Sequence, residues 1–74
     1  MMHRLDATGL SCPLPVLRAK KVLRTLDPGD SLEIRATDPS APKDFEAFCE
    51  TTRTILESVT EEGSVFVITI RRPA

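Results

Sequence analysis

The chain has 74 residues, of which 41% are hydrophobic and 28% charged, and these proportions indicate one globular domain spanning residues 1–74. Its net charge is −1 and it has no Trp or Tyr, so it lacks the basic excess and stacking aromatics of nucleic-acid-binding surfaces, and no direct nucleic-acid contact is expected. No apolar run is long enough to span a bilayer and residues 1–6 lack the apolar stretch of a secretory signal, so we expect no membrane contact and a cytoplasmic protein with reduced cysteines.

The first half of the chain predicts a strand, a helix and a second strand. Residues 2–6 predict a short strand, and residues 7–11 predict a turn. Over residues 13–26 a core-facing stripe recurs at helical spacing, formed by Val16, Ala19, Val22, Leu23 and Leu26. Asp27-Pro28-Gly29 is expected to end this helix, because proline cannot continue it. Residues 31–36 alternate between apolar and charged side chains, which predicts a strand with one solvent-facing side.

The second half predicts another helix and two more strands. The turn over residues 38–42 leads into a helix whose core-facing side carries Phe45, Phe48, Cys49 and Thr52. Residues 53–61 are poorly patterned and predict a strand over residues 55–60, followed by a hairpin turn at residues 61–63 and a last strand at residues 64–71. The order β-α-β-α-β-β predicts an α+β fold, a two-layer α/β sandwich with both helices on one face of a four-stranded mixed sheet. Its first β-α-β unit should be parallel and right-handed.

The candidate functional residue is Cys12, which follows a turn containing Gly9 and precedes Pro13 and Pro15. Proline is tolerated in the first turn of a helix, so the cysteine should lie at or just before a helix N-terminus. Unpaired backbone N–H groups and partial positive charge at such an end favour thiolate over thiol. We therefore expect Cys12 to be an exposed sulfur, largely ionised near neutral pH, on a backbone stiffened by the two prolines.

Two helix starts are compatible with the prolines. If Cys12 is the N-cap, Pro13 is the first helical residue and the N–H of Leu14 is the natural donor to the sulfur. A residue before proline avoids the α region, however, and Leu14 precedes Pro15. The helix could therefore begin at Pro15, with Cys12 just outside it.

The same residues allow interpretations other than a reactive Cys12. A cysteine before a helix can be a small buried hydrophobe, but the rigid double-proline frame favours the reactive thiol. Cys49 lies on the apolar helix stripe and is expected in the core. The chain has one histidine, His3, and no Cys-x-x-Cys pair, so we expect no metal site and no thioredoxin-like centre. It also offers no obvious general base. Asp6 and Asp38 are expected to stabilise turns.

A partner surface is expected around Cys12. Leu10, Leu14 and Leu17 are predicted to form an exposed apolar rim suited to transient docking. Arg18 and Lys20 lie near the helix start, where they could steer a partner or hold an anionic sulfur. Because the chain offers no obvious general base, and a thiolate held by a helix end needs none, the sequence favours a group carrier over a self-sufficient hydrolase.

The chain resembles the small sulfur-carrier family that contains TusA and the SirA-like proteins. The motifs that carry the resemblance extend over nearly the whole length: Leu5-Asp6-Ala7-Thr8-Gly9-Leu10, Cys12-Pro13-Leu14-Pro15, Lys20-Lys21, Pro28-Gly29-Asp30, Thr37-Asp38-Pro39, Asp44-Phe45 and Phe48-Cys49. The resemblance implies the same sandwich. It also implies that Cys12 receives a persulfide sulfur from a donor such as a cysteine desulfurase or rhodanese and relays it to an acceptor protein. In the family that sulfur serves tRNA thiolation, molybdenum-cofactor supply or sulfur oxidation.

Two departures from the family pattern leave the pathway open. Leu14 stands where the tRNA-thiolation type has an acid, and Arg53-Thr54 stands where that type has Gly-His or Glu-His. The resemblance implies no cofactor other than a transient persulfide on Cys12. The alternatives are a regulatory module that binds a partner through its leucine rim without sulfur transfer, and a redox-sensing thiol protein.

Overall fold

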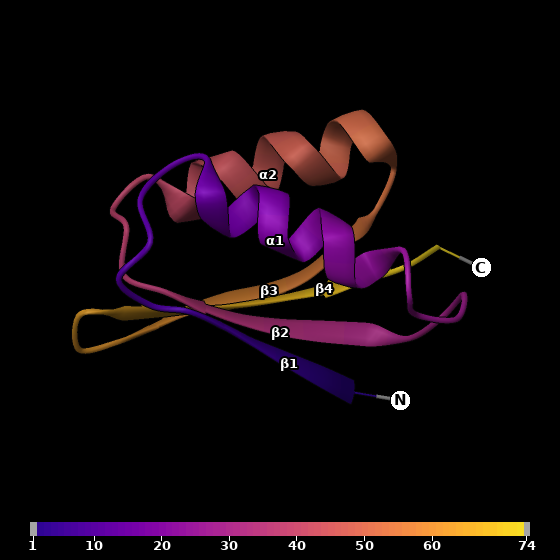
Figure 1. Ribbon diagram of the computed structural model, residues 1–74, viewed down its shortest axis with the longest axis horizontal. Coiled ribbons are helices and arrows are strands. Elements are labelled where there is room, and N and C mark those ends of the chain that lie inside the picture. Colours follow the sequence, from indigo (N-terminus) through magenta and orange to yellow (C-terminus); the bar gives the residue numbers. More distant parts are fainter. Residues whose placement is uncertain (1, 74) are drawn as a thin grey trace.

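Two helices cover one face of a four-stranded sheet, as the pattern of apolar residues predicts (Figure 1). The computed structural model describes residues 2–73. Its elements in chain order are β1 (Met2–Ala7), α1 (Leu14–Leu23), β2 (Ser31–Ala36), α2 (Ala41–Thr52), β3 (Ile55–Glu62) and β4 (Val65–Arg71). None of the helices within the described residues is both long and apolar enough to cross a membrane.

The sheet has the strand order β1-β2-β4-β3. β1 and β2 are parallel, which confirms the prediction for the first β-α-β unit, and the other neighbours are antiparallel. Ala7 pairs with Ala36, so β1 and β2 end together at one edge of the sheet. The two loops that follow these strands therefore leave from the same edge, and one of them carries Cys12.

The core lies between the helices and the sheet. Its largest fully buried side chains are Phe45, Leu32, Ile34, Ile68 and Ile70. The rings of Phe45 and Phe48 meet edge to face, with 6.4 Å between their centroids. Cys49 is buried as predicted, whereas Thr52 is exposed and its hydroxyl bonds back to the Phe48 carbonyl.

The first helix is shorter at its C-terminal end than the prediction of residues 13–26. After Leu23 the chain tightens, with Thr25 N–H donating to the Val22 carbonyl and Leu26 N–H to the Leu23 carbonyl, a spacing of three residues. Arg72 reaches across from the far end of the chain, and its guanidinium donates to the carbonyls of Leu23 and Leu26. A cation bonded to the last carbonyls of a helix satisfies acceptors that have no partner within the helix.

Three strands differ from their predicted bounds by one or two residues. β3 continues to Glu62, so the hairpin turn moves from residues 61–63 to residues 63–64. A β-bulge between Leu56 and Ser58 interrupts the pairing with β4. A bulge inserts one residue into the two-residue alternation of a strand, and this explains the poor pattern of the segment. β1 also extends one residue beyond its predicted end, to Ala7, and β4 begins at Val65 rather than at residue 64.

Arg53 ends α2 in the left-handed region, with φ of 60°. Side chains other than glycine are strained there by contact between Cβ and the backbone. We expect Arg53→Gly to raise the free energy of unfolding by about 0.5–1 kcal/mol, because relief of this strain exceeds the greater freedom of glycine in the unfolded chain. Urea denaturation would measure it. The neighbouring change Thr51→Gly, inside the helix, should lower stability, and a loss for Arg53→Gly would contradict the argument.

Candidate functional site

Cys12 lies on the loop between β1 and α1 and is exposed. Hydrogen bonds within the loop fix its path. The Asp6 carboxylate accepts from the Thr8 backbone N–H over 3.0 Å and from the Thr8 hydroxyl over 2.6 Å, which confirms a turn-stabilising role for Asp6. Gly9, at φ of 80°, donates its N–H to the hydroxyl oxygen of Thr37 over 2.9 Å. The loop after β1 is thereby tied to the loop after β2.

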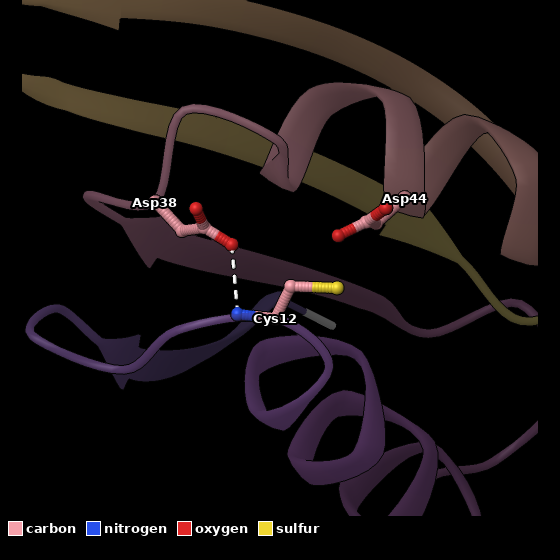
Figure 2. Close-up of side chains that lie close together, drawn as sticks. All are labelled: Cys12, Asp38 and Asp44. Carbon is pink, nitrogen blue, oxygen red and sulfur yellow. Dashed lines mark hydrogen bonds between the residues drawn. The ribbon is translucent and has the colours of Figure 1, made fainter.

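Asp38 makes the second connection between these loops. The backbone N–H of Cys12 donates to Asp38 Oδ2 over 2.8 Å (Figure 2). The same carboxylate oxygen lies 2.8 Å from the Ser40 hydroxyl, and this hydroxyl is the main cause of a lowered pKa at Asp38. Asp38 therefore stabilises its turn, as predicted, and also anchors the backbone of the candidate residue.

The helix start agrees with neither predicted register. α1 begins at Leu14 and Pro13 is its N-cap. The N–H of Leu14 donates to the Ser11 carbonyl over 2.9 Å, so it is not the donor to sulfur that the first register required. Pro15 is buried in the first turn and Pro13 is exposed.

The sulfur of Cys12 lies among carboxylates. It points toward Asp44, in the first turn of α2 (Figure 2). The sulfur and one carboxylate oxygen each of Asp38 and Asp44 all lie within 4.8 Å of one another. The Ser40 hydroxyl lies 3.2 Å from Asp44 Oδ2 as well as close to Asp38, so it bridges the two acids.

These neighbours reverse the predicted ionisation of Cys12. The neighbouring Asp44 carboxylate, which can accept a hydrogen bond from the thiol, is the main cause of a raised pKa at Cys12; partial desolvation and the negative charges of Asp44 and Asp38 act in the same direction. The Ser40 hydroxyl opposes them. The expectation of a largely ionised thiol was therefore wrong, because the acids of the loop after β2 and of α2 raise the pKa of Cys12 rather than lower it. The expectation of an exposed thiol is confirmed.

Cys12 stands at one end of a groove of about 420 Å³ between α1 and α2. Leu17 and Lys20 line the groove from α1, and Asp44 and Phe48 line it from α2. Of the two cations predicted near Cys12, Arg18 and Lys20, it is Lys20 that lines the groove containing the thiol. Arg18 lines a different groove of about 550 Å³, together with Leu14 and Leu17.

The predicted leucine rim is only partly present. Leu14 and Leu17 are 43% and 52% exposed, but Leu10 is half-buried and packs against the core. The loop after β1 turns Leu10 inward because its N–H donates back to the Ala7 carbonyl over 3.3 Å. The apolar surface beside Cys12 therefore consists of Leu14 and Leu17.

The remaining candidates do not join the site. His3 contacts Asp30, with 3.3 Å between its Nε2 and the carboxylate Oδ2. Burial raises the pKa of the Cys49 thiol to about 11, so Cys49 is a neutral core residue. The absence of a metal site stays a prediction, since two half-buried carboxylates beside an exposed thiol assign no ion by themselves.

Sequence reasoning missed Asp44 and did not place Asp38 beside the thiol. The bond from Cys12 to Asp38 joins residues 26 positions apart. One signal was available, because a parallel first β-α-β unit brings the ends of β1 and β2 to one edge. The pattern of apolar residues did not indicate that α2 lies beside the loop after β1.

Comparisons with known proteins agree with this fold. The sequence model of the family Sulfurtransferase TusA matches residues 3–72. A relative from Neisseria meningitidis, named as a sulfur carrier, is 51% identical over 67 residues, 90% of each chain. Sulfur carrier protein TusA of Allochromatium vinosum is 48% identical, covering 95% of this chain and 92% of the relative. The crystal structure of a SirA-like protein from Desulfitobacterium hafniense superposes with a TM-score of 0.84 at 27% identity, covering 100% of both chains. The chain therefore belongs to the sulfurtransferase TusA family.

Proposed function

We propose that this protein is a sulfur carrier that accepts a persulfide sulfur on Cys12 and relays it to an acceptor protein. Sulfur relay is the role of the family to which the chain belongs. The observation that supports Cys12 as the carrier atom is the contrast between the two cysteines: Cys12 is exposed, whereas Cys49 is buried. A carrier must present its sulfur to two successive partners, and an exposed loop at a groove meets that need.

The proposed loading step conserves atoms and electrons. The sulfur of Cys12 attacks the outer sulfur of a donor persulfide, forming a new S–S bond as the donor's own S–S bond breaks. The donor leaves as a thiol, which takes up the proton that Cys12 loses, and Cys12 carries the persulfide. Transfer to the acceptor repeats this exchange in the opposite sense, so no external oxidant or reductant is needed.

The proposed partners are a sulfur donor, such as a cysteine desulfurase or rhodanese, and a downstream acceptor protein. No resident cofactor is proposed, because the transferred group is the persulfide itself. Leu14, Leu17, Arg18 and Lys20 form the proposed docking surface. All four are exposed on α1; Leu17 and Lys20 line the groove that contains Cys12, and Leu14 and Arg18 line the neighbouring groove with Leu17. Together they combine apolar contact with positive charge suited to an acidic partner.

Leu17→Asp is expected to slow sulfur transfer from a donor protein by about tenfold, because it places a charge in the apolar part of this surface. The matched control is Val59→Asp on β3, where the native valine is 40% exposed and the same charge is introduced. Initial rates of loading would be measured for both variants. Equal slowing, or no slowing of either, would remove α1 as the docking surface.

The test of the proposed function is intact mass after incubation with a cysteine desulfurase and cysteine. A gain of one sulfur atom, removed by a reducing thiol, supports the carrier role; a chain that gains no sulfur from either a desulfurase or a rhodanese contradicts it. A regulatory module would keep its partner-dependent activity without gaining sulfur. A redox sensor would instead accumulate a sulfenic acid or mixed disulfide.

A further inference from the structure

The two carboxylates beside Cys12 have no cationic partner. Ion pairs on the described residues join His3 to Asp30, Arg4 and Arg35 to Glu33, and Arg71 to Glu57. Within residues 2–73, neither Asp38 nor Asp44 takes part in one. Their hydrogen-bond partners are neutral: the Cys12 N–H and the Ser40 N–H and hydroxyl for Asp38, and the Ser40 hydroxyl for Asp44. No cation paired with them within residues 2–73 therefore offsets the charge of these two carboxylates beside the sulfur.

Charged groups reach the sulfur from three sides. Asp44 faces it from α2, Asp38 faces it from the loop after β2, and Lys20 lines the same groove from α1. The two acids have oxygens within 4.8 Å of the sulfur. Lys20 forms no ion pair with either acid in the described part of the chain, and it is exposed to solvent that screens its charge. The charges that act on the Cys12 thiol are those of Asp44 and Asp38, and both raise its pKa.

We infer that Asp44 is a positioning residue for sulfur transfer: its carboxylate holds the resting Cys12 sulfur in the protonated form and makes the loaded, anionic sulfur easier to give away. This inference rests on the proposed carrier function. Asp38 contributes the second negative charge, but its oxygens are already bonded to a backbone N–H and a hydroxyl. Asp44 is the acid toward which the sulfur points (Figure 2).

The loaded and the unloaded states of Cys12 both favour release of the outer sulfur to the acceptor. A persulfide ionises more readily than a thiol, so loaded Cys12 carries an anionic sulfur close to two carboxylates and is destabilised by like charge. When the acceptor's thiol attacks the outer sulfur, the S–S bond to Cys12 breaks and the Cys12 sulfur takes up the proton that the acceptor thiol loses. The resulting neutral thiol lies beside Asp44, whose carboxylate favours the protonated form and so stabilises the unloaded carrier.

The first test needs no sulfur donor. The rate of alkylation by iodoacetamide is measured against pH in a Cys49→Ser background, where Cys12 is the one thiol. Asp44→Asn should move the midpoint of the profile to lower pH and make alkylation several-fold faster at neutral pH. Glu46→Gln is the matched control, since it removes one charge from an exposed position of the same helix that does not line the groove. Identical profiles for the two variants would overturn the inference.

The second test measures sulfur retention. Carrier loaded with glutathione persulfide is equilibrated with glutathione, and the loaded fraction is read by intact mass. Asp44→Asn should retain a larger loaded fraction than the native chain, and an equal or smaller fraction would overturn the inference. If neither chain loads at Cys12, the proposed function fails, whereas the alkylation profile still decides whether Asp44 controls the thiol.

A purely structural role for Asp44 would not change the pH profile of a folded variant. Thermal unfolding of each variant checks that the fold is intact. Asp44→Ser removes the same charge from the first turn of α2, where serine is well tolerated, and serves as a second variant if Asp44→Asn does not fold. The midpoint should move in the same direction for both.

Discussion

Cys12→Ser should abolish sulfur loading, whereas Cys49→Ser should load as fully as the native chain. A serine oxygen cannot form the S–S bond in which the transferred sulfur is held, so the loss should be complete rather than partial. Cys49 is 4% exposed, so a donor protein cannot reach its thiol. Burial also raises the pKa of this thiol to about 11, so it is rarely ionised at neutral pH. Intact mass after incubation with a cysteine desulfurase and cysteine measures both variants.

The pair of variants separates chemistry from folding. Cys12 is exposed, and its replacement by serine removes no core contact, so the thermal midpoint of Cys12→Ser should remain that of the native chain. Equal loading of Cys12→Ser and native protein would show that the sulfur is carried elsewhere. Loss of loading in a folded Cys49→Ser variant would show that the buried thiol is needed for sulfur loading, which its buried position does not predict.

Phe45→Ala should cost about 3–5 kcal/mol of unfolding free energy, the usual range for removing a buried phenylalanine. Phe45 is 0% exposed and stands between α2 and the sheet, where its ring meets the edge of Phe48. Small domains have a total stability of about 5–15 kcal/mol, so this one change should leave the fold marginal or unfolded at 37 °C. Urea denaturation followed by circular dichroism measures the change.

Two further variants make this prediction specific to burial. Phe45→Leu keeps most of the apolar volume and should cost less than Phe45→Ala. Val59→Ala removes an apolar side chain that is 40% exposed on β3 and should change stability by less than either. A urea midpoint for Phe45→Ala equal to that of the native chain would mean that the helix layer does not depend on this ring.

The environment of Cys12 suits a carrier better than a nucleophilic enzyme. Catalytic cysteines have a lowered pKa because cations or a helix end stabilise the thiolate. In this chain Asp44 and Asp38 act in the opposite direction, and the thiol is neutral at rest. We expect the partner enzymes to activate the attacking sulfur, while this protein presents it in a fixed and accessible place.

The sequence alone determined the architecture and the candidate sulfur. Helical and alternating periodicities placed the six elements in their correct order, because the core of a two-layer fold requires one apolar side on each element. The Cys-Pro-Leu-Pro element, with the motifs around it, indicated the family and predicted that Cys12 is exposed. Boundaries were less exact where a bulge at β3 interrupted the alternation and where Arg72 bonded to the end of α1.

Only the tertiary structure decided the charge state of that sulfur. Local sequence shows the helix that follows Cys12, and a helix end alone favours the thiolate. The carboxylates that reverse this effect come from the loop after β2 and from α2, and the parallel pairing of β1 and β2 carries that loop to the edge where Cys12 lies. Electrostatic energy depends on the distance between charges in space. The order of residues along the chain does not give these distances, so the charged neighbours of the thiol are known only from the folded structure.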